Sequence, residues 1–156
     1  MGECHEREED KKMKIAFGSD PNATEFKKEL MKYTKELGYE VFDLGSDDPI
    51  YANVAFECAK AVADKEYDRG ILLCGTGIGV SIAANKVKGA YAACVHDIYQ
   101  AQRAQLSNNA NIITMGSQVI GIELAKCMVK EYLSLCFDPN SRSKEKVERI
   151  VEYEGL

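Results

Sequence analysis

Short apolar segments alternate with longer amphipathic segments along almost the whole chain. The apolar segments have the length of buried strands, and the amphipathic ones carry apolar residues at helical spacing. We expect strands at residues 14–19, 40–45, 70–74, 90–96 and 111–116, and helices at 24–37, 51–65, 80–86, 97–106, 119–135 and 141–154. This alternation predicts an α/β protein, a Rossmann-like three-layer α/β/α sandwich around a doubly wound, five-stranded parallel sheet, with an extra C-terminal helix.

The first twelve residues differ from the rest because they are charged throughout. We expect residues 1–12 to be a disordered extension and residues 13–156 to form one domain. The sequence has neither a bilayer-spanning apolar run nor the apolar region of a secretory signal, so we expect a cytoplasmic protein. The net charge of −5 argues against nucleic-acid and membrane partners, although a local basic cluster could still bind a small anion.

Six cysteines are present, without a CxxC pair. Cys58, Cys94, Cys127 and Cys136 lie in apolar strand or helix patterns. We therefore expect reduced, mostly buried thiols, with neither disulfides nor zinc. With only two histidines in the chain, we do not expect a histidine-rich metal site.

The third expected strand ends at Cys74 and runs directly into the glycine-rich turn GTGIG. Backbone amides in such a turn bind anions and would stabilise a thiolate. Cys74 could be one more buried cysteine, but its position at a strand end favours a functional role. Thr76 adds a hydroxyl that could bond a substrate oxygen. The spacing is neither GxGxxG nor that of a P-loop, which disfavours dinucleotides and nucleoside triphosphates.

Ligands of doubly wound sheets bind beyond the carboxyl ends of the strands. Ser19 and Asp20 end the first strand and His96 ends the fourth, and we expect them near Cys74, together with the loop that contains Asn108. Asp20 could carry out acid–base work there. His96 could do the same, or could only bond a backbone group. The asparagine could donate to a substrate carbonyl, or could only form a turn.

Two basic residues near the C-terminus, Arg142 and Lys146, are four positions apart. That spacing predicts one shared face of the last helix. There they could hold a phosphate group, or they could belong to an ordinary solvated face. The sequence alone leaves both interpretations open.

The motif LLCGTGIGVSIAANK, with KIAFGSD, HDIYQAQRA, NNANIITMGSQVIGIELA and SRSKEKV, resembles the ribose-5-phosphate isomerase B family, which also includes galactose-6-phosphate isomerase. These segments cover nearly all of the chain after residue 12. The resemblance implies aldose–ketose isomerisation of a small sugar phosphate through a cis-enediolate, without a metal or an organic cofactor. It also implies a homodimer or homotetramer with the active site near the subunit interface.

The resemblance also implies roles for individual residues. Cys74 matches the base that moves a proton between C1 and C2, and the turn Gly75–Gly79 with Thr76 would stabilise the enediolate oxygens. Arg142 and Lys146 match the basic pair that holds the phosphate and often reaches a neighbouring subunit. Together with the residues at the strand ends, the expected catalytic residues are Cys74, Thr76, Asp20 and His96, and the expected substrate-binding residues are Ser19, Gly75, Gly77, Ile78, Gly79, Asn108, Arg142 and Lys146.

The chain departs from the family's pattern at several positions. Pro21 stands where the family commonly has a phosphate-side histidine, and Ser107 stands where it has the histidine that helps to open the sugar ring. Asp48 replaces a tyrosine, and Gln118 replaces an arginine. Two imidazoles and one guanidinium are therefore missing from the places where the family has them.

The expected reaction interconverts ribose 5-phosphate and ribulose 5-phosphate, as in the pentose phosphate pathway, with His96 or Asp20 taking over ring opening. The alternative is another phosphosugar, such as a tetrulose, galactose or allose phosphate. A tetrulose phosphate has no furanose or pyranose ring that demands the missing acid. A non-catalytic phosphosugar-binding protein is a further possibility, but such a protein has no need of the base Cys74.

Overall fold

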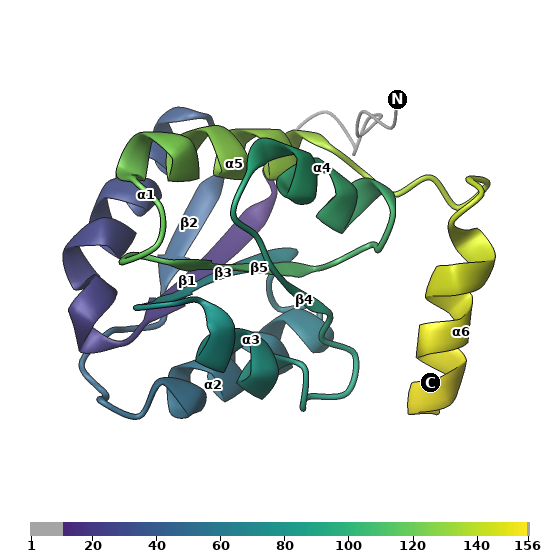
Figure 1. Cartoon of the computed structure of the whole chain (residues 1–156), viewed down its shortest axis with the longest axis horizontal. Helices are drawn as coiled ribbons and strands as arrows, with labels where there is room; N and C mark the ends of the chain where they lie inside the picture. Colours follow the sequence, from purple (N-terminus) through teal and green to yellow (C-terminus); the bar gives the residue numbers. More distant parts are fainter. Residues whose placement is uncertain (1–10, 156) are drawn as a thin grey trace.

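A five-stranded parallel sheet forms the centre of the chain in a computed structural model that describes residues 11–155 (Figure 1). The strand order is β2-β1-β3-β5-β4, and every pairing is parallel. The fold class predicted from the sequence is confirmed. The strands are β1 Lys14–Ser19, β2 Glu40–Asp43, β3 Arg69–Cys74, β4 Ala92–Cys94 and β5 Ile112–Gly116.

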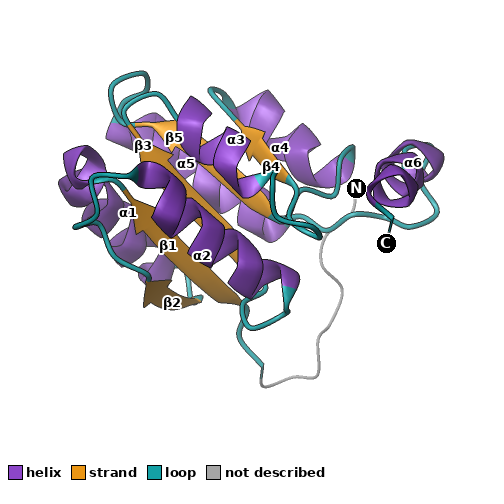
Figure 2. Cartoon of the chain, turned by 90° about the horizontal axis from the view of Figure 1, so that it is seen from below, coloured by secondary structure: helices purple, strands orange, loops and turns teal. Residues whose placement is uncertain are grey.

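Helices cover both faces of the sheet (Figure 1). One face carries α1, α4 and α5, and the other carries α2 and α3. The last helix, α6, stands beside the sheet instead of on either face, which Figure 2 shows from a second direction. The helices are α1 Thr24–Glu36, α2 Tyr51–Ala63, α3 Ile78–Ala84, α4 Ile98–Leu106, α5 Ile122–Ser134 and α6 Lys144–Glu154, with a short 3-10 helix at Pro21–Ala23.

The apolar strands are buried because both of their faces are covered. All six residues of β3 are buried, as are the last five of β1 and all of β5. Continuous apolar runs of this kind are typical of central parallel strands. Each face of the sheet packs its own hydrophobic cluster against its helices. This rigid centre fixes the positions of the residues that follow each strand.

Three helix starts differ by two or three residues from the sequence-based expectation. α3 begins at Ile78, two residues before the expected start at Val80. α5 begins at Ile122 and not at Val119, because the N–H groups of Gln118 and Val119 donate to the carbonyls of the turns around Gly75 and Gly116. α6 begins at Lys144, so Arg142 lies in the turn before the helix. Most of the extension expected at residues 1–12 falls outside the described residues. Within them, no helix is long and apolar enough to cross a membrane.

The cysteines are less uniform than expected. Cys58 is buried, and burial raises the pKa of its thiol to about 12. Cys94 is half-buried, whereas Cys127 is exposed on α5. Cys136 is disulfide-bonded, so the expectation of a chain without disulfides is wrong. It lies beyond the end of α5 and is only half-buried, outside the apolar helix pattern that suggested an inert thiol.

Candidate active site

The thiol of Cys74 lies under the turn that follows β3. Cys74 is the last residue of this strand, pairs with Gly116 at the end of β5, and is 4% exposed. The Gly77 N–H donates a hydrogen bond to its sulfur, with 3.1 Å between N and Sγ. A backbone donor at this distance stabilises a thiolate, because it places positive hydrogen directly against the sulfur.

Two glycines allow the turn to pack tightly against β5. Gly77 has φ 78°, a left-handed conformation that favours glycine, and a Cβ there would lie 2.7 Å from the Met115 carbonyl carbon. A Cβ on Gly116 would lie 2.5 Å from the carbonyl carbon of Thr76. The Thr114 hydroxyl then donates to the Gly77 carbonyl at 2.7 Å. The turn is therefore held in one conformation before any ligand binds.

The amides of this turn divide into two groups. Those of Gly77 and Ile78 already donate within the chain, to Cys74 Sγ and to Thr76 Oγ1 respectively. Those of Gly75, Thr76 and Gly79 have no acceptor among residues 11–155. Preorganised donors beside a thiolate base can stabilise negative charge that develops on a substrate oxygen. The arrangement can therefore remove a proton from a carbon next to a carbonyl group.

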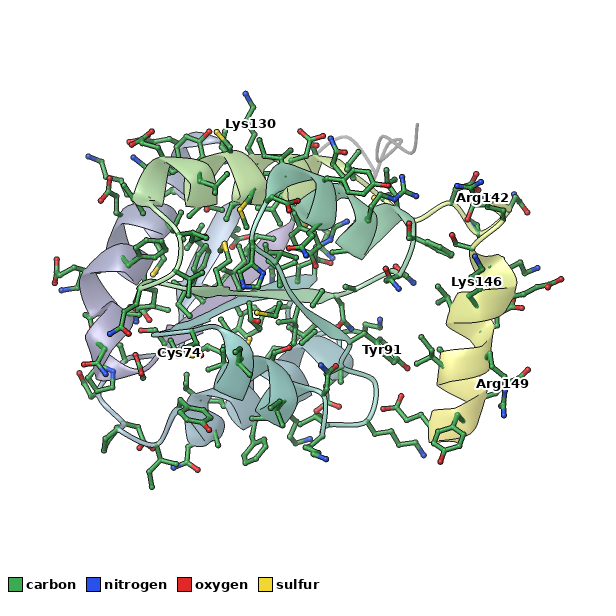
Figure 3. The ribbon with its side chains drawn as sticks, viewed as in Figure 1. Cys74, Tyr91, Lys130, Arg142, Lys146 and Arg149 are labelled. Atoms are coloured by element: carbon green, nitrogen blue, oxygen red, sulfur yellow. The ribbon has the colours of Figure 1, made fainter. Side chains whose placement is uncertain are left out.

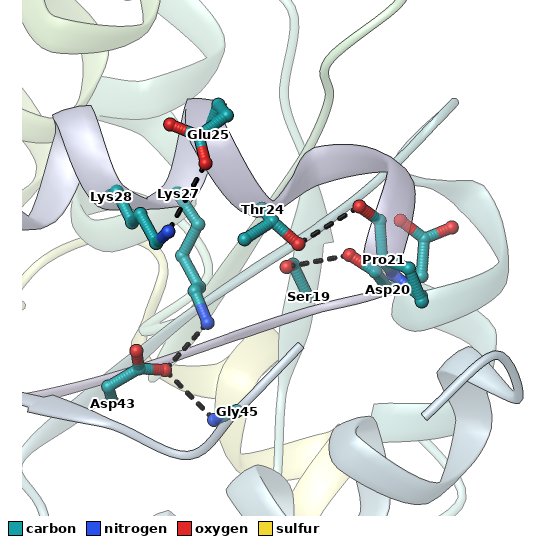
Figure 4. Close-up of polar contacts among 9 residues, drawn as sticks. All are labelled: Ser19, Asp20, Pro21, Thr24, Glu25, Lys27, Lys28, Asp43 and Gly45. Carbon is teal, nitrogen blue, oxygen red and sulfur yellow. Dashed lines mark hydrogen bonds and ion pairs between the residues drawn. The ribbon is translucent and has the colours of Figure 1, made fainter. Parts of the chain in front are cut away.

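Asp20 lies beside Cys74 because β1 and β3 are neighbours. The Asp20 N–H donates to the Leu73 carbonyl at 3.3 Å, and its side chain is only 9% exposed. Its Oδ1 accepts from the Ala23 N–H at 3.2 Å, which caps the 3-10 helix. The hydroxyl of Ser19 donates to the Asp20 carbonyl at 2.9 Å (Figure 4). The structure thus brings Ser19 and Asp20 to the Cys74 end of the sheet.

The loop after β2 is fixed next to these residues by a buried lysine. Lys27 is 1% exposed, and its Nζ lies 2.6 Å from Asp43 Oδ1 (Figure 4). The same carboxylate oxygen accepts from the Gly45 N–H at 2.9 Å, and the Gly45 carbonyl accepts from the Ser19 N–H. Burial raises the pKa of Asp43, but its bonds to Lys27 and Gly45 outweigh this and hold that pKa below its usual value.

His96 is further from the thiol than Asp20 is. It follows β4, and β5 lies between that edge strand and β3. Its side chain is exposed, and its backbone N–H donates to Gln100 Oε1 at 2.7 Å. Among the described residues, no hydrogen bond joins its imidazole to Cys74 or Asp20. A catalytic role for His96 stays a prediction.

Asn108 lies at the opposite edge of the sheet, so the expectation that its loop would adjoin Cys74 is wrong. The loop precedes β5, and a loop that enters a parallel strand lies at the amino edge. Five residues of strand at about 3.3 Å each separate the two edges by roughly 15 Å. The expected site residues therefore form two separate groups in one chain.

The second group surrounds a cavity of about 350 Å³ between α4 and α6. Asn108, Arg142 and Lys146 line it, together with Arg103 and Ser107. The prediction that the two C-terminal cations share a helix face is wrong, because Arg142 precedes the helix. They nevertheless face the same cavity. Figure 3 shows both at the α6 end of the molecule and Cys74 on the other side.

α6 is held in place at its far end. Glu154 Oε2 accepts hydrogen bonds from the Tyr91 hydroxyl at 2.7 Å and from the Gly89 N–H at 3.2 Å. Burial, followed by the hydrogen bond and charge of Glu154, raises the pKa of Tyr91 to about 12. Every side chain of α6 is at least partly exposed. Among residues 11–155, the hydrogen bonds that join α6 to the rest of the chain are therefore at Glu154, the end of the helix away from Arg142 and Lys146.

Two of the departures from the family pattern have a visible structural setting. The Asp48 carboxylate accepts from the Ile50 N–H and from Asn53 Nδ2, both at 2.8 Å, and so fixes the start of α2. The Gln118 amide packs on the turn, since a Cβ on Gly75 would lie 3.2 Å from its Oε1. Within residues 11–155, no group of three or more His, Cys, Asp and Glu is placed to hold a metal ion.

One residue of the second group was missed in the sequence. Arg103 lines the cavity from α4, and its Nε donates to Ser107 Oγ at 2.6 Å. The signal was the spacing of four between a cation and a hydroxyl at the end of a helix. That spacing is too common on solvated helices to single out the pair.

The comparisons with known proteins agree with this geometry. The family model described as Ribose/Galactose Isomerase matches residues 15–150. The chain is 47% identical over 149 residues to D-erythrulose-4-phosphate isomerase 2 of Mycolicibacterium smegmatis, which covers 92% of this chain and 98% of that protein. It is 44% identical over 143 residues to ribose-5-P isomerase B of Listeria innocua, and the match covers 90% of this chain and 96% of that protein. The solved ribose-5-phosphate isomerase B of Clostridium thermocellum superposes on this chain with a TM-score of 0.86 at 40% sequence identity. The match covers 91% of this chain and 97% of that structure.

Proposed function

The chain belongs to the ribose/galactose isomerase family of sugar-phosphate aldose–ketose isomerases, and we propose that Cys74 is its catalytic base. The observation that carries the proposal is the hydrogen bond from the Gly77 N–H to the sulfur, inside a turn that two glycines fix. A thiolate held in this way can accept a proton from carbon. The unengaged amides of Gly75 and Gly79 can then donate to the oxygens of the enediolate.

The proposed reaction moves one proton between two carbons. The thiolate removes the proton from C2 of the aldose, and the electrons of that bond form the C1–C2 double bond of a cis-enediolate. The resulting thiol returns the proton to C1, which gives the ketose without net gain or loss of atoms. Asp20, buried beside the Cys74 strand, moves the proton between O1 and O2. This chemistry requires neither a metal nor an organic cofactor.

We propose that two copies of the chain share each active site. The base at the carboxyl edge and the cations at the amino edge cannot reach one small substrate within a single chain. Large apolar side chains are exposed on the helices that begin at the carboxyl edge of the sheet: Ile78 by 55% and Ile82 by 59% on α3, and Tyr99 by 70% on α4. Such exposure favours cover by another protein surface. A second copy would bring Arg142 and Lys146 to Cys74, either in a homodimer or in a homotetramer built from such dimers.

Ribose 5-phosphate, converted into ribulose 5-phosphate in the cytoplasm, is one candidate substrate. The name of the Listeria innocua relative supports it. Ring opening would then fall to Asp20 or His96, because Ser107 offers no imidazole. Within one chain, Asp20 and His96 follow strands at the carboxyl edge of the sheet, whereas Ser107 precedes β5 at the amino edge.

A tetrulose 4-phosphate is the second candidate, and the site favours it. Ser107 carries a hydroxyl that accepts a hydrogen bond from Arg103, so it supplies no general acid of the imidazole kind. A tetrose 4-phosphate needs none, because its O4 carries the phosphate and cannot close a furanose ring. The name of the Mycolicibacterium smegmatis relative points to the same substrate class.

A panel of tetrose, pentose and hexose phosphates tests these proposals. We expect the highest kcat/KM for D-erythrulose 4-phosphate, with ribulose 5-phosphate below it. A clear preference for the pentose phosphate would overturn the four-carbon assignment. Binding of several phosphosugars without turnover of any would instead identify a phosphosugar-binding protein.

A further inference from the structure

Three cations from separate parts of the chain face one cavity, and none of them has a carboxylate partner among the described residues. Arg103 comes from α4, Arg142 from the turn before α6, and Lys146 from α6 itself. None of the described residues that line this cavity is acidic. None of the three cations forms an ion pair among residues 11–155, whereas the neighbouring Arg149 does. Like charges gathered in this way repel one another, and a bound anion would relieve that repulsion.

Arg103 differs from the other two cations in how it is held. Arg142 and Lys146 are exposed, but Arg103 is half-buried. Its Nε–H donates to Ser107 Oγ at 2.6 Å, across one turn at the end of α4. A guanidinium that uses Nε in this way keeps both of its Nη groups for a second ligand. Two parallel N–H donors match the oxygens of a phosphate group.

We propose that Arg103 binds the phosphate group of the substrate as the third cation beside Arg142 and Lys146. Ser107 is a positioning residue, which fixes the direction of the guanidinium through its hydroxyl. The inference rests on the proposed function, since it assigns the phosphate of that substrate to this cavity. In this proposal, Ser107 contributes to phosphate binding by orienting Arg103 and takes no part in proton transfer. It also places one rigid, partly buried cation in a site whose other two cations are exposed.

The test compares Arg103→Gln with Arg149→Gln in the full chain. Arg149 lies on α6, is paired with Glu152 at 3.5 Å, and does not line the cavity, so it is a matched control. Two quantities are measured: steady-state kinetics with D-erythrulose 4-phosphate and ribulose 5-phosphate, and calorimetric binding of inorganic phosphate. For Arg103→Gln we expect KM and the Kd for phosphate to rise about 10- to 100-fold, as for loss of a charge-assisted hydrogen bond, with kcat within about threefold.

The conservative variants separate binding from positioning. Arg103→Lys keeps the positive charge but loses the two parallel N–H donors of the guanidinium, so we expect an intermediate rise in KM. Ser107→Ala should raise KM about 3- to 10-fold, and Ser107→Thr, which keeps the hydroxyl, should restore it. Thermal unfolding of every variant checks that the fold is intact. A merely structural Ser107 would alter the melting temperature without this split between KM and kcat.

The outcomes distinguish this inference from the proposed function. If Arg103→Gln and Arg103→Lys bind phosphate and substrate as tightly as Arg149→Gln does, the inference is wrong even when the enzyme isomerises a sugar phosphate. If the wild-type chain turns over none of the sugar phosphates but binds inorganic phosphate in an Arg103-dependent manner, the inference stands and the proposed function fails.

Discussion

A heterodimer made from two inactive variants should regain activity. In one chain, the Cys74 edge and the Arg142 edge are separated by the length of β5, about 15 Å. A site that contains both must therefore take them from different copies. If one copy carries Cys74→Ala and the other carries Arg142→Ala with Lys146→Ala, one of the two sites in the heterodimer is fully wild type. The other site has lost both its base and its cations.

The two variants are co-expressed with different tags, and the heterodimer is purified over both. We expect its kcat/KM to be about half that of the wild-type dimer, because one of its two equivalent sites is intact and a site without its phosphate-binding cations contributes little at low substrate concentration. In the matched control, a wild-type copy is paired with a copy that carries all three substitutions. Sites shared between copies leave this control with almost no kcat/KM, whereas sites within one copy leave it with about half of the wild-type kcat/KM. An inactive first heterodimer beside a half-active control would refute the shared site.

Two further predictions concern stability and specificity. Asp43→Asn should lower the free energy of unfolding by about 2 kcal/mol, which is less than for a fully buried pair, because Lys27 is 1% exposed but Asp43 is 43% exposed and is screened by water. Because the pKa of Asp43 is lowered in the folded chain, the carboxylate stabilises the fold above the pKa that it has in the unfolded chain, and this stabilisation is lost as the pH falls through the folded pKa. Urea unfolding between pH 7 and pH 3 measures this loss in the wild-type chain and its absence in Asp43→Asn. An Asp43→Asn variant as stable as the wild-type chain at every pH would contradict the prediction. Ser107→His should raise the ratio of kcat/KM for ribose 5-phosphate to kcat/KM for D-erythrulose 4-phosphate, because histidine supplies an imidazole for ring opening. An unchanged ratio would show that residue 107 does not determine the preference between a ring-forming pentose phosphate and a tetrulose phosphate.

The positions of the strands and of Cys74 could be predicted because they depend on local patterns. β3 contains a continuous apolar run that ends in a glycine-rich turn, and this pattern is typical of a buried parallel strand. The position of Asn108 could also have been predicted from the order of the elements. Its loop comes before β5, and in a parallel sheet that order alone places the loop at the amino edge. Grouping it with the strand ends was an error of topology rather than a missing signal.

The position of α6 and the role of Arg103 could not be predicted in this way. α6 is placed by the hydrogen bond between Glu154 and Tyr91, which lie 63 positions apart in the sequence. Arg103 joins the other cations only because α4 and α6 face the same cavity. Such long-range contacts leave no periodic pattern in the sequence. The disulfide of Cys136 was missed for a related reason, since spacing alone does not show which thiols meet.

Solvent deuterium exchange tests the role of Cys74 as base most directly. The enzyme is incubated with D-erythrulose 4-phosphate or ribulose 5-phosphate in D₂O, and proton NMR follows the signals at C1 and C2. We predict that the wild-type enzyme incorporates deuterium there, that Cys74→Ala incorporates none above the uncatalysed rate, and that both bind inorganic phosphate equally well. Incorporation by Cys74→Ala at the wild-type rate would contradict the assignment of Cys74 as the catalytic base.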